Sequence, residues 1–200
     1  MTNFKIRKYK NTVTEAELYE ALNYVNHSRE KRSYYAQMIL NNLELVAPLL
    51  NILFTVDDKV SCRAAWVFEY ACSADISISH RHLDYFTENI NRVHLDPAVR
   101  PVAKVCELLI ANHYKAKAVT PNVLSLDHRE RITEACFDWM ISDQKVAVKA
   151  YSMSTLYQLG REFDWIHPEL LIILERDFAK ESAAFKARAR HIIKRLKSKR

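Results

Sequence analysis

The sequence predicts an all-α chain built from a repeated pair of helices, and three observations favour this fold class. Only one of the 200 residues is glycine, so backbone turns that need a positive φ are scarce. Apolar residues make up 49% of the chain, which is enough for one continuous core. The segment DDKVSCRAAWV at 57–67 returns as DQKVAVKAYSM at 143–153. An internal repeat of this kind predicts a solenoid.

The repeat occurs four times when the anchor Val60 is aligned with Val99, Val146 and Phe185. The anchors lie 39, 47 and 39 residues apart, a spacing typical of stacked helix pairs. An alanine follows each anchor by four residues, where a small side chain lets a neighbouring helix approach. An aspartate or serine precedes each anchor by three residues and is expected to cap the helix: Asp57, Asp96, Asp143 and Ser182.

The remaining helices follow from caps and apolar periodicity. Thr14 and Glu17 form a predicted capping box, and Ser28 is expected to begin the next helix. An amphipathic stretch precedes each repeated motif, at 48–54, 82–90, 131–141 and 168–178. The chain is therefore expected to be a single domain, with a leading pair at 14–42 and repeats at 43–78, 79–115, 127–161 and 167–197. Residues 114–127 are expected to form a loop-like insertion in the middle repeat.

The Asp-x-x-Val-x-x-Arg/Lys-Ala pattern at ~40-residue spacing resembles the HEAT/armadillo class of α-solenoids. The resemblance implies a right-handed α-α superhelix of about five helix pairs, with the second helix of each pair on the concave side. It also implies a ladder between repeats, made by the turn aspartate and the basic residue six places on. Asp57/Arg63 and Asp143/Lys149 fit this spacing, whereas the repeat of Asp96 has a valine at the sixth place.

The whole chain is also similar to short bacterial HEAT-like proteins that often carry the label adenylosuccinate lyase. No segment matches the GSSxMPxKxNP-type signature of that lyase superfamily. Some HEAT-like proteins are alkylpurine DNA glycosylases, which use concave tryptophans beside an aspartate. Trp139 and Asp143 have a fitting spacing, although Asp143 is also the expected cap of the following helix.

Positive charge is concentrated at the two ends of the chain. Residues 186–200 carry eight Lys or Arg and residues 1–10 carry four, with no acid in either segment. The rest of the chain has 18 basic against 24 acidic residues, so it is mildly acidic. On a helix, the C-terminal candidates for binding nucleic-acid phosphates are Lys186, Arg190, Lys194 and Arg195. A solvated capping helix would carry the same charges.

The second helices are expected to expose a groove that holds an extended partner. Its candidate binding residues are Arg63, Trp66, Tyr70, Arg100, Lys104, Glu107, Lys149 and Arg188. Trp66 and Tyr70 lie one helical turn apart and either contact a partner or pack between repeats. We therefore expect a non-enzymatic module that binds a protein or peptide. A nucleic-acid-binding protein, with or without glycosylase chemistry, is the alternative.

No motif in the chain predicts catalysis or a bound group. There is no CxxC, HxxxH or glycine-rich phosphate loop, so no catalytic residue, metal site or cofactor is expected. The four cysteines lie in apolar helical stretches and are expected to be buried free thiols. The sequence lacks an apolar run of membrane-spanning length and a signal-peptide core, so we expect a cytoplasmic protein without membrane partners.

Overall fold

The structure is a computed structural model that describes residues 13–116 and 123–198. The described residues form α-helices and short 3-10 helices, without a strand among them. The α-helices are α1 Glu15–Leu22, α2 Arg29–Asn41, α3 Val46–Thr55, α4 Lys59–Ala74, α5 Leu83–Asn89, α6 Asp96–Ala116, α7 Leu126–Ile141, α8 Val146–Leu159, α9 Ile166–Asp177 and α10 Ala183–Lys197. The 3-10 helices are η1 Leu43–Leu45, η2 Ile76–His82 and η3 Ile90–Arg92.

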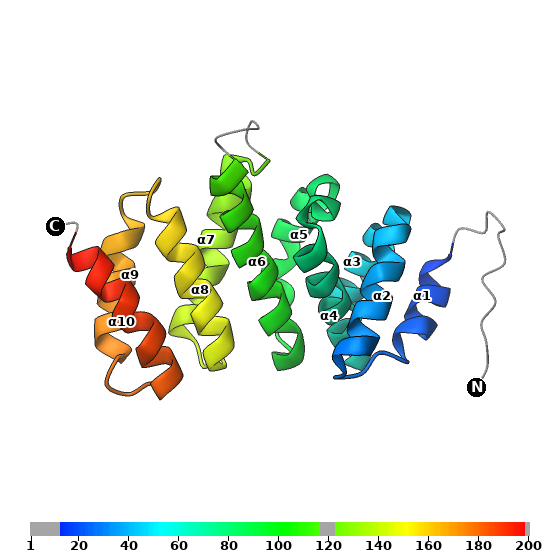
Figure 1. Cartoon of the computed structure of the whole chain (residues 1–200), viewed down its shortest axis with the longest axis horizontal. Coiled ribbons are helices and arrows are strands. Elements are labelled where there is room, and N and C mark those ends of the chain that lie inside the picture. Colours follow the sequence, from blue (N-terminus) through cyan, green and yellow to red (C-terminus); the bar gives the residue numbers. More distant parts are fainter. Residues whose placement is uncertain (1–12, 117–122, 199–200) are drawn as a thin grey trace.

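The helices stack side by side as an all-α solenoid with two layers (Figure 1). The second-helix layer consists of α2, α4, α6, α8 and α10, and the first-helix layer of α1, α3, α5, α7 and α9. Each helix of the second-helix layer packs along the next one, whereas neighbours in the first-helix layer contact one another less. The second helices therefore form one continuous surface along the stack.

Helix pairs are joined through a core of buried apolar side chains. Phe86 of α5 lies against both Phe54 of α3 and Phe68 of α4, with ring centroids 5.9 and 5.6 Å apart. Phe86 and Phe68 are almost completely buried. Burial of one such ring is worth about 1.5–3 kcal/mol, so this cluster fixes how consecutive pairs stack.

Several of the predicted helix starts are confirmed. Thr14 and Glu17 form the reciprocal capping box of α1, and Ser28 and Ser182 accept hydrogen bonds from the first turns of α2 and α10. Residues 48–54, 82–90, 131–141 and 168–178 all fall largely within helices of the first layer.

Three predicted caps are wrong by one or two residues. Asp96 is itself the first residue of α6, so the cap position precedes it. The cap of α4 is Asp58, whose carboxylate accepts from the backbone N–H groups of Val60 and Ser61, while the Asp57 carboxylate is exposed and contacts His94. Helix α8 begins after Lys145, which makes no side-chain cap hydrogen bond, and Asp143 lies exposed in the preceding turn. The sequence pattern could not tell which of two adjacent aspartates is the N-cap, because backbone geometry determines the cap residue.

The anchor assigned to α8 is also wrong. Val146 is exposed, and the buried face of α8 contains Val148, Ser152, Thr155 and Leu159. Those positions have the same spacing as the buried Val60, Ala64, Val67 and Ala71 of α4. The register of α8 is therefore shifted by two residues, because serine and threonine occupy sites at which the other repeats have apolar or small side chains.

The four cysteines are free and buried, as expected. Of the expected insertion at 114–127, the first residues extend α6 and the last begin α7, and residues 117–122 lie outside the described residues. Within the described ranges, no single helix is long and apolar enough to cross a membrane; α2 together with 43–55 passes by length and composition, but the two are bent by 109°.

Candidate functional site on the second-helix layer

Helix α4 presents the two aromatic candidates of the second-helix layer. The Trp66 indole N–H donates to the carbonyl oxygen of Pro97 at 2.7 Å, and the His27 ring lies 4.9 Å from the indole. The Arg32 guanidinium lies over the Tyr70 ring, 4.8 Å from its centroid. Both aromatic side chains are half-buried. They pack between repeats and still leave part of each ring exposed at the surface.

An ion pair joins α4 to α6. Arg100 donates to both carboxylate oxygens of Glu69, at 3.0 and 2.7 Å. Burial lowers the pKa of Arg100, but the hydrogen bonds and charge of Glu69 outweigh it and raise that pKa above its usual value. Glu69 is buried, so a bidentate cation is the partner that makes its burial tolerable.

Two lysines make the next contacts between second helices, toward the C-terminal end of the stack. Lys104 donates to Glu107 at 2.7 Å and lies 4.9 Å from the centroid of the Tyr151 ring on α8. Lys149 is buried and donates to Glu181, just before α10, at 2.6 Å. The Lys104 contact links α6 with α8, and the Lys149 contact links α8 with the start of α10.

The two outer arginines of the predicted groove bind neutral groups of neighbouring repeats. Arg63 donates to the carbonyl and side-chain oxygens of Asn23, both at 3.1 Å. Arg188 donates to the Ser154 hydroxyl at 3.1 Å. All eight groove candidates therefore lie on the second-helix layer or its edges, and most of their polar atoms already have partners in the chain.

The ladder implied by the resemblance has different members from those expected. Asp57 contacts His94 at 3.2 Å, and Asp96 contacts Lys145 at 3.3 Å. Each pair joins the turn before one second helix to the turn before the next. The basic residue at the sixth place, Arg63, turns back toward the preceding repeat instead. A rung between neighbouring repeats exists, but its basic residue, His94 or Lys145, precedes the helix.

The arginines of α10 lie on two sides of the helix, one facing α8 and the other facing α9. Arg188 and Arg195 face α8, where Arg195 lies 5.9 Å from the centroid of the Tyr157 ring. Arg190 faces α9, 5.8 Å from the centroid of Phe178. Of the predicted phosphate-binding residues, Lys186, Arg190 and Lys194 recur at one-turn intervals on α10, whereas Arg195 lies on the side that faces α8.

Lys186 and Lys194 have no acidic partner among the described residues, whereas Lys197 pairs with Glu175 at 2.7 Å. Lys186 is half-buried and Lys194 is exposed. The last two cations of the sequence, Lys199 and Arg200, lie outside the described residues. None of the four predicted phosphate-binding residues therefore pairs with an acid of the described chain, and Arg190 and Arg195 lie over aromatic rings instead.

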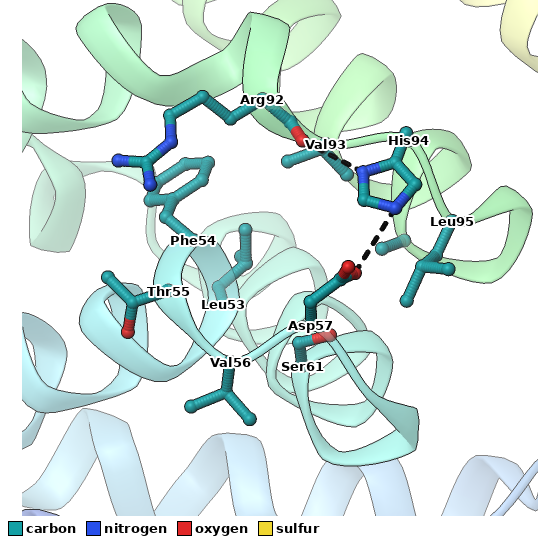
Figure 2. A pocket seen from close by; sticks show the side chains of 11 residues that line it. Leu53, Phe54, Thr55, Val56, Asp57, Ser61, Arg92, Val93, His94 and Leu95 are labelled. Carbon is teal, nitrogen blue, oxygen red and sulfur yellow. Dashed lines mark hydrogen bonds and ion pairs between the residues drawn. The ribbon is translucent and has the colours of Figure 1, made fainter.

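A shallow pocket lies where the turn before α4 meets the turn before α6 (Figure 2). Its volume is about 180 Å³, and Leu53 and Phe54 contribute apolar walls. Figure 2 shows Asp57 and His94 meeting at its rim, and the backbone oxygen of Arg92 approaches the other ring nitrogen of His94 at 3.2 Å. The pocket has room for one side chain of a partner, and no pattern in the sequence predicted it.

Ser125, His128 and Asp84 lie together, but their hydrogen bonds cap a helix and do not have the arrangement of a catalytic triad. His128 contacts Asp84 through Nε2 at 2.7 Å, and its Nδ1 accepts from the backbone N–H of Ser125. The Ser125 hydroxyl caps α7 by accepting from the backbone N–H of His128, so the imidazole does not face that hydroxyl. Trp139, the glycosylase candidate, is buried in the core.

No group of three His, Cys, Asp or Glu side chains in 13–116 and 123–198 is placed to hold a metal ion. Sequence reasoning missed the partners His27, Arg32 and Glu181 and did not pair Tyr151 with Lys104, because each contact comes from another repeat. The apolar and charge periodicity of one helix gives no signal for a contact across repeats.

A family model described as a HEAT repeat domain matches residues 18–196, which is most of the chain. No curated protein matches the chain. No solved structure matches it either.

Proposed function

Because the chain belongs to the HEAT repeat family, we propose that it is a non-enzymatic binding module that holds an extended protein or peptide segment along its second-helix layer. HEAT repeats commonly mediate protein interactions, which supports this class of function. The observation that carries the proposal is the unbroken packing of α2, α4, α6, α8 and α10 into one surface.

The chemistry of that surface suits a segment with apolar and polar side chains in alternation. Trp66, Tyr70 and Tyr151 are half-buried rings whose orientation is held by contacts from other repeats. Rings that are already fixed lose little conformational entropy when a partner covers them, so they are suitable anchors. The paired charges between them provide a polar rim without an uncompensated cost of burial.

The test begins with covalent cross-linking of the tagged full-length chain in its own cells and identification of the captured protein. Affinity for the purified partner is then measured for Tyr70→Ala and Tyr151→Ala. We expect each to weaken binding by about tenfold or more, the loss typical of an aromatic anchor. Tyr85→Ala is the matched control, since Tyr85 is 36% exposed on α5, in the first-helix layer.

The control should change the affinity by less than about twofold, and thermal melts should show that all three variants are folded. Equal weakening by all three tyrosine variants, or no effect of Tyr70→Ala and Tyr151→Ala, would contradict the proposed site. Those results would place the partner on another face of the solenoid.

Nucleic-acid binding is the second candidate, and it is favoured by Lys186, Arg190, Lys194 and Arg195, which have no acidic partner in the described chain. Fluorescence anisotropy of labelled duplex DNA and single-stranded RNA, at about 50 and 200 mM salt, tests it directly. Binding should collapse in the triple variant Lys186→Glu/Arg190→Glu/Lys194→Glu. The control triple Lys31→Glu/Lys59→Glu/Arg81→Glu changes the charge equally at exposed sites on other helices. Absence of binding at low salt would rule out nucleic-acid binding as the function.

A further inference from the structure

The first-helix layer has an exposed apolar surface where α7 and α9 meet. The rings of Phe137 on α7 and Trp165 at the start of α9 stack with centroids 5.4 Å apart and planes inclined by 22°. Ile141 follows Phe137 by one turn, and Ile172 follows Trp165 by two. Trp165, Ile141 and Ile172 are 54%, 58% and 58% exposed. We call these four residues the α7/α9 patch; exposed apolar side chains gathered on neighbouring helices mark interaction sites.

Acidic side chains border the α7/α9 patch. Glu130, Glu134 and Asp138 recur at one-turn intervals on the exposed face of α7, and Glu169 lies between Trp165 and Ile172 on α9. The side chains of these four acids form no hydrogen bond or ion pair with residues 13–116 or 123–198. The patch therefore combines uncovered apolar surface with uncompensated negative charge, and a fitting partner carries apolar and basic side chains together.

One segment of the same chain has this composition. Residues 4–10, FKIRKYK, contain three apolar or aromatic residues and four cations with no acid. From this complementarity of charge and apolar character, we propose that the α7/α9 patch binds residues 4–10 of a second copy of the chain. This contact uses the first-helix layer and is independent of a partner on the second-helix layer.

A second copy is favoured over the same copy, because the segment before α1 is barely long enough to reach the α7/α9 patch of its own chain. The α7/α9 patch lies three to four helix positions from α1, and helices pack about 8–10 Å apart, which gives roughly 24–40 Å. The nine residues from Phe4 to Val13 span roughly 30 Å when fully extended, but only about 15–18 Å on average for a flexible chain. An intramolecular contact would need a nearly taut segment, whereas another copy can approach freely.

The donor segment and the α7/α9 patch are different surfaces, so the contact is heterologous and copies can add in sequence. Sedimentation velocity of the full-length chain from about 5 to 500 µM should therefore show a mass that rises with concentration. Because charge contributes to the contact, the association should weaken by about fivefold or more between about 50 and 300 mM salt.

Charge reversal separates this contact from non-specific association. The patch variant Glu134→Lys/Glu169→Lys and the donor variant Lys5→Glu/Arg7→Glu should each lower self-association at least fivefold. Mixing the two variants should restore association, since the reversed donor now meets a reversed patch. The control Glu20→Lys/Glu44→Lys changes two exposed acids near the other end of the solenoid and should leave self-association unchanged.

The proposal is overturned if the wild-type chain stays monomeric up to about 500 µM at low salt, if the patch variant associates like the wild type, or if the mixture shows no rescue. Ile172→Ser tests the apolar part separately and should also weaken association at least threefold. Its side chain is mostly exposed, so folding is not at risk, and an unchanged association would likewise overturn the apolar role.

Discussion

At the scale of single residues, Gly160 is placed for a close contact rather than for an unusual backbone angle. Its φ of −64° is open to any residue. A Cβ at this position would overlap the ring of His167, which contacts the Tyr157 carbonyl oxygen at 2.9 Å and stacks on the Tyr157 ring at 5.5 Å. The ring is held from two directions, so it has little freedom to move aside.

We expect Gly160→Ala to lower the free energy of unfolding by about 1–3 kcal/mol, as overpacking does. In a His167→Ala background the same change should be neutral or stabilising by about 0.4–1 kcal/mol, because alanine restricts the unfolded chain. Urea titrations of the wild type, the two single variants and the double variant give a double-mutant cycle of unfolding free energies. An equal loss in both backgrounds would show that the ring is not the cause.

The buried thiols predict how stability depends on pH. Burial raises the pKa of Cys136 to about 12 and those of Cys72 and Cys106 well above their usual value. An unfolded thiol ionises near pH 8.5, so above that pH the unfolded state loses protons that the folded state keeps. The stabilisation is therefore complete below about pH 8.5 and is lost as pH rises toward the folded pKa.

Between pH 7.5 and 9.5, Cys136 alone should account for a loss of about 1.4 kcal/mol of unfolding free energy. Urea titrations at both pH values measure this loss for the wild type and Cys136→Ala. The variant should be less stable at pH 7.5 because of the cavity, yet its loss between the two pH values should be smaller by about that amount. The same pH dependence in both proteins would contradict the assignment.

At the scale of elements, the two adjacent aspartates before α4 have different structural roles. Asp58 caps the helix and also accepts from the Tyr19 hydroxyl at 2.8 Å, which ties α1 to α4. The hydrogen bonds from Tyr19 and from the first turn outweigh burial and lower the pKa of Asp58. Asp57 is mostly exposed, and its polar partner within the described chain is His94.

Asp58→Ala should therefore lower the free energy of unfolding by about 1–2 kcal/mol, the usual loss for an N-cap. Asp57→Ala is the matched control and should cost less than about 0.5 kcal/mol, as expected of an exposed polar contact. Chemical denaturation at pH 7 separates the two outcomes. If Asp57→Ala were the more damaging change, the cap would be the residue that the sequence pattern first indicated.

The sequence predicted elements better than it predicted their contacts. Helix existence followed from apolar periodicity and from local caps such as Ser28, because both signals lie within one helix. The predicted register of α8, with Val146 as its anchor, was wrong, since Ser152 is buried at the site where the other repeats have an alanine. Of the candidate site, the residues of the second-helix layer could be named, but the Glu69–Arg100 pair could not, because its members come from different repeats.

At the scale of the whole molecule, stability depends mainly on contacts between adjacent helix pairs, because each pair packs mainly against the pairs beside it. Helices α4, α6 and α8 have a second-helix neighbour on both sides, whereas α2 and α10 have one. Stability should therefore fall from the middle of the stack toward its ends. The terminal pairs open by themselves at a lower free energy than the centre.

Hydrogen exchange with mass spectrometry tests this gradient, with amides of α4, α6 and α8 exchanging slowest. Phe185→Ala removes a buried ring of α10 and should speed exchange in α9 and α10 while leaving α2–α4 within about twofold of the wild type. Phe86→Ala, at the centre, should speed exchange in the helix pairs on both sides of α5. If Phe185→Ala accelerated exchange equally along the chain, the solenoid would open as one cooperative unit, and a partner bound at one end would stabilise every repeat.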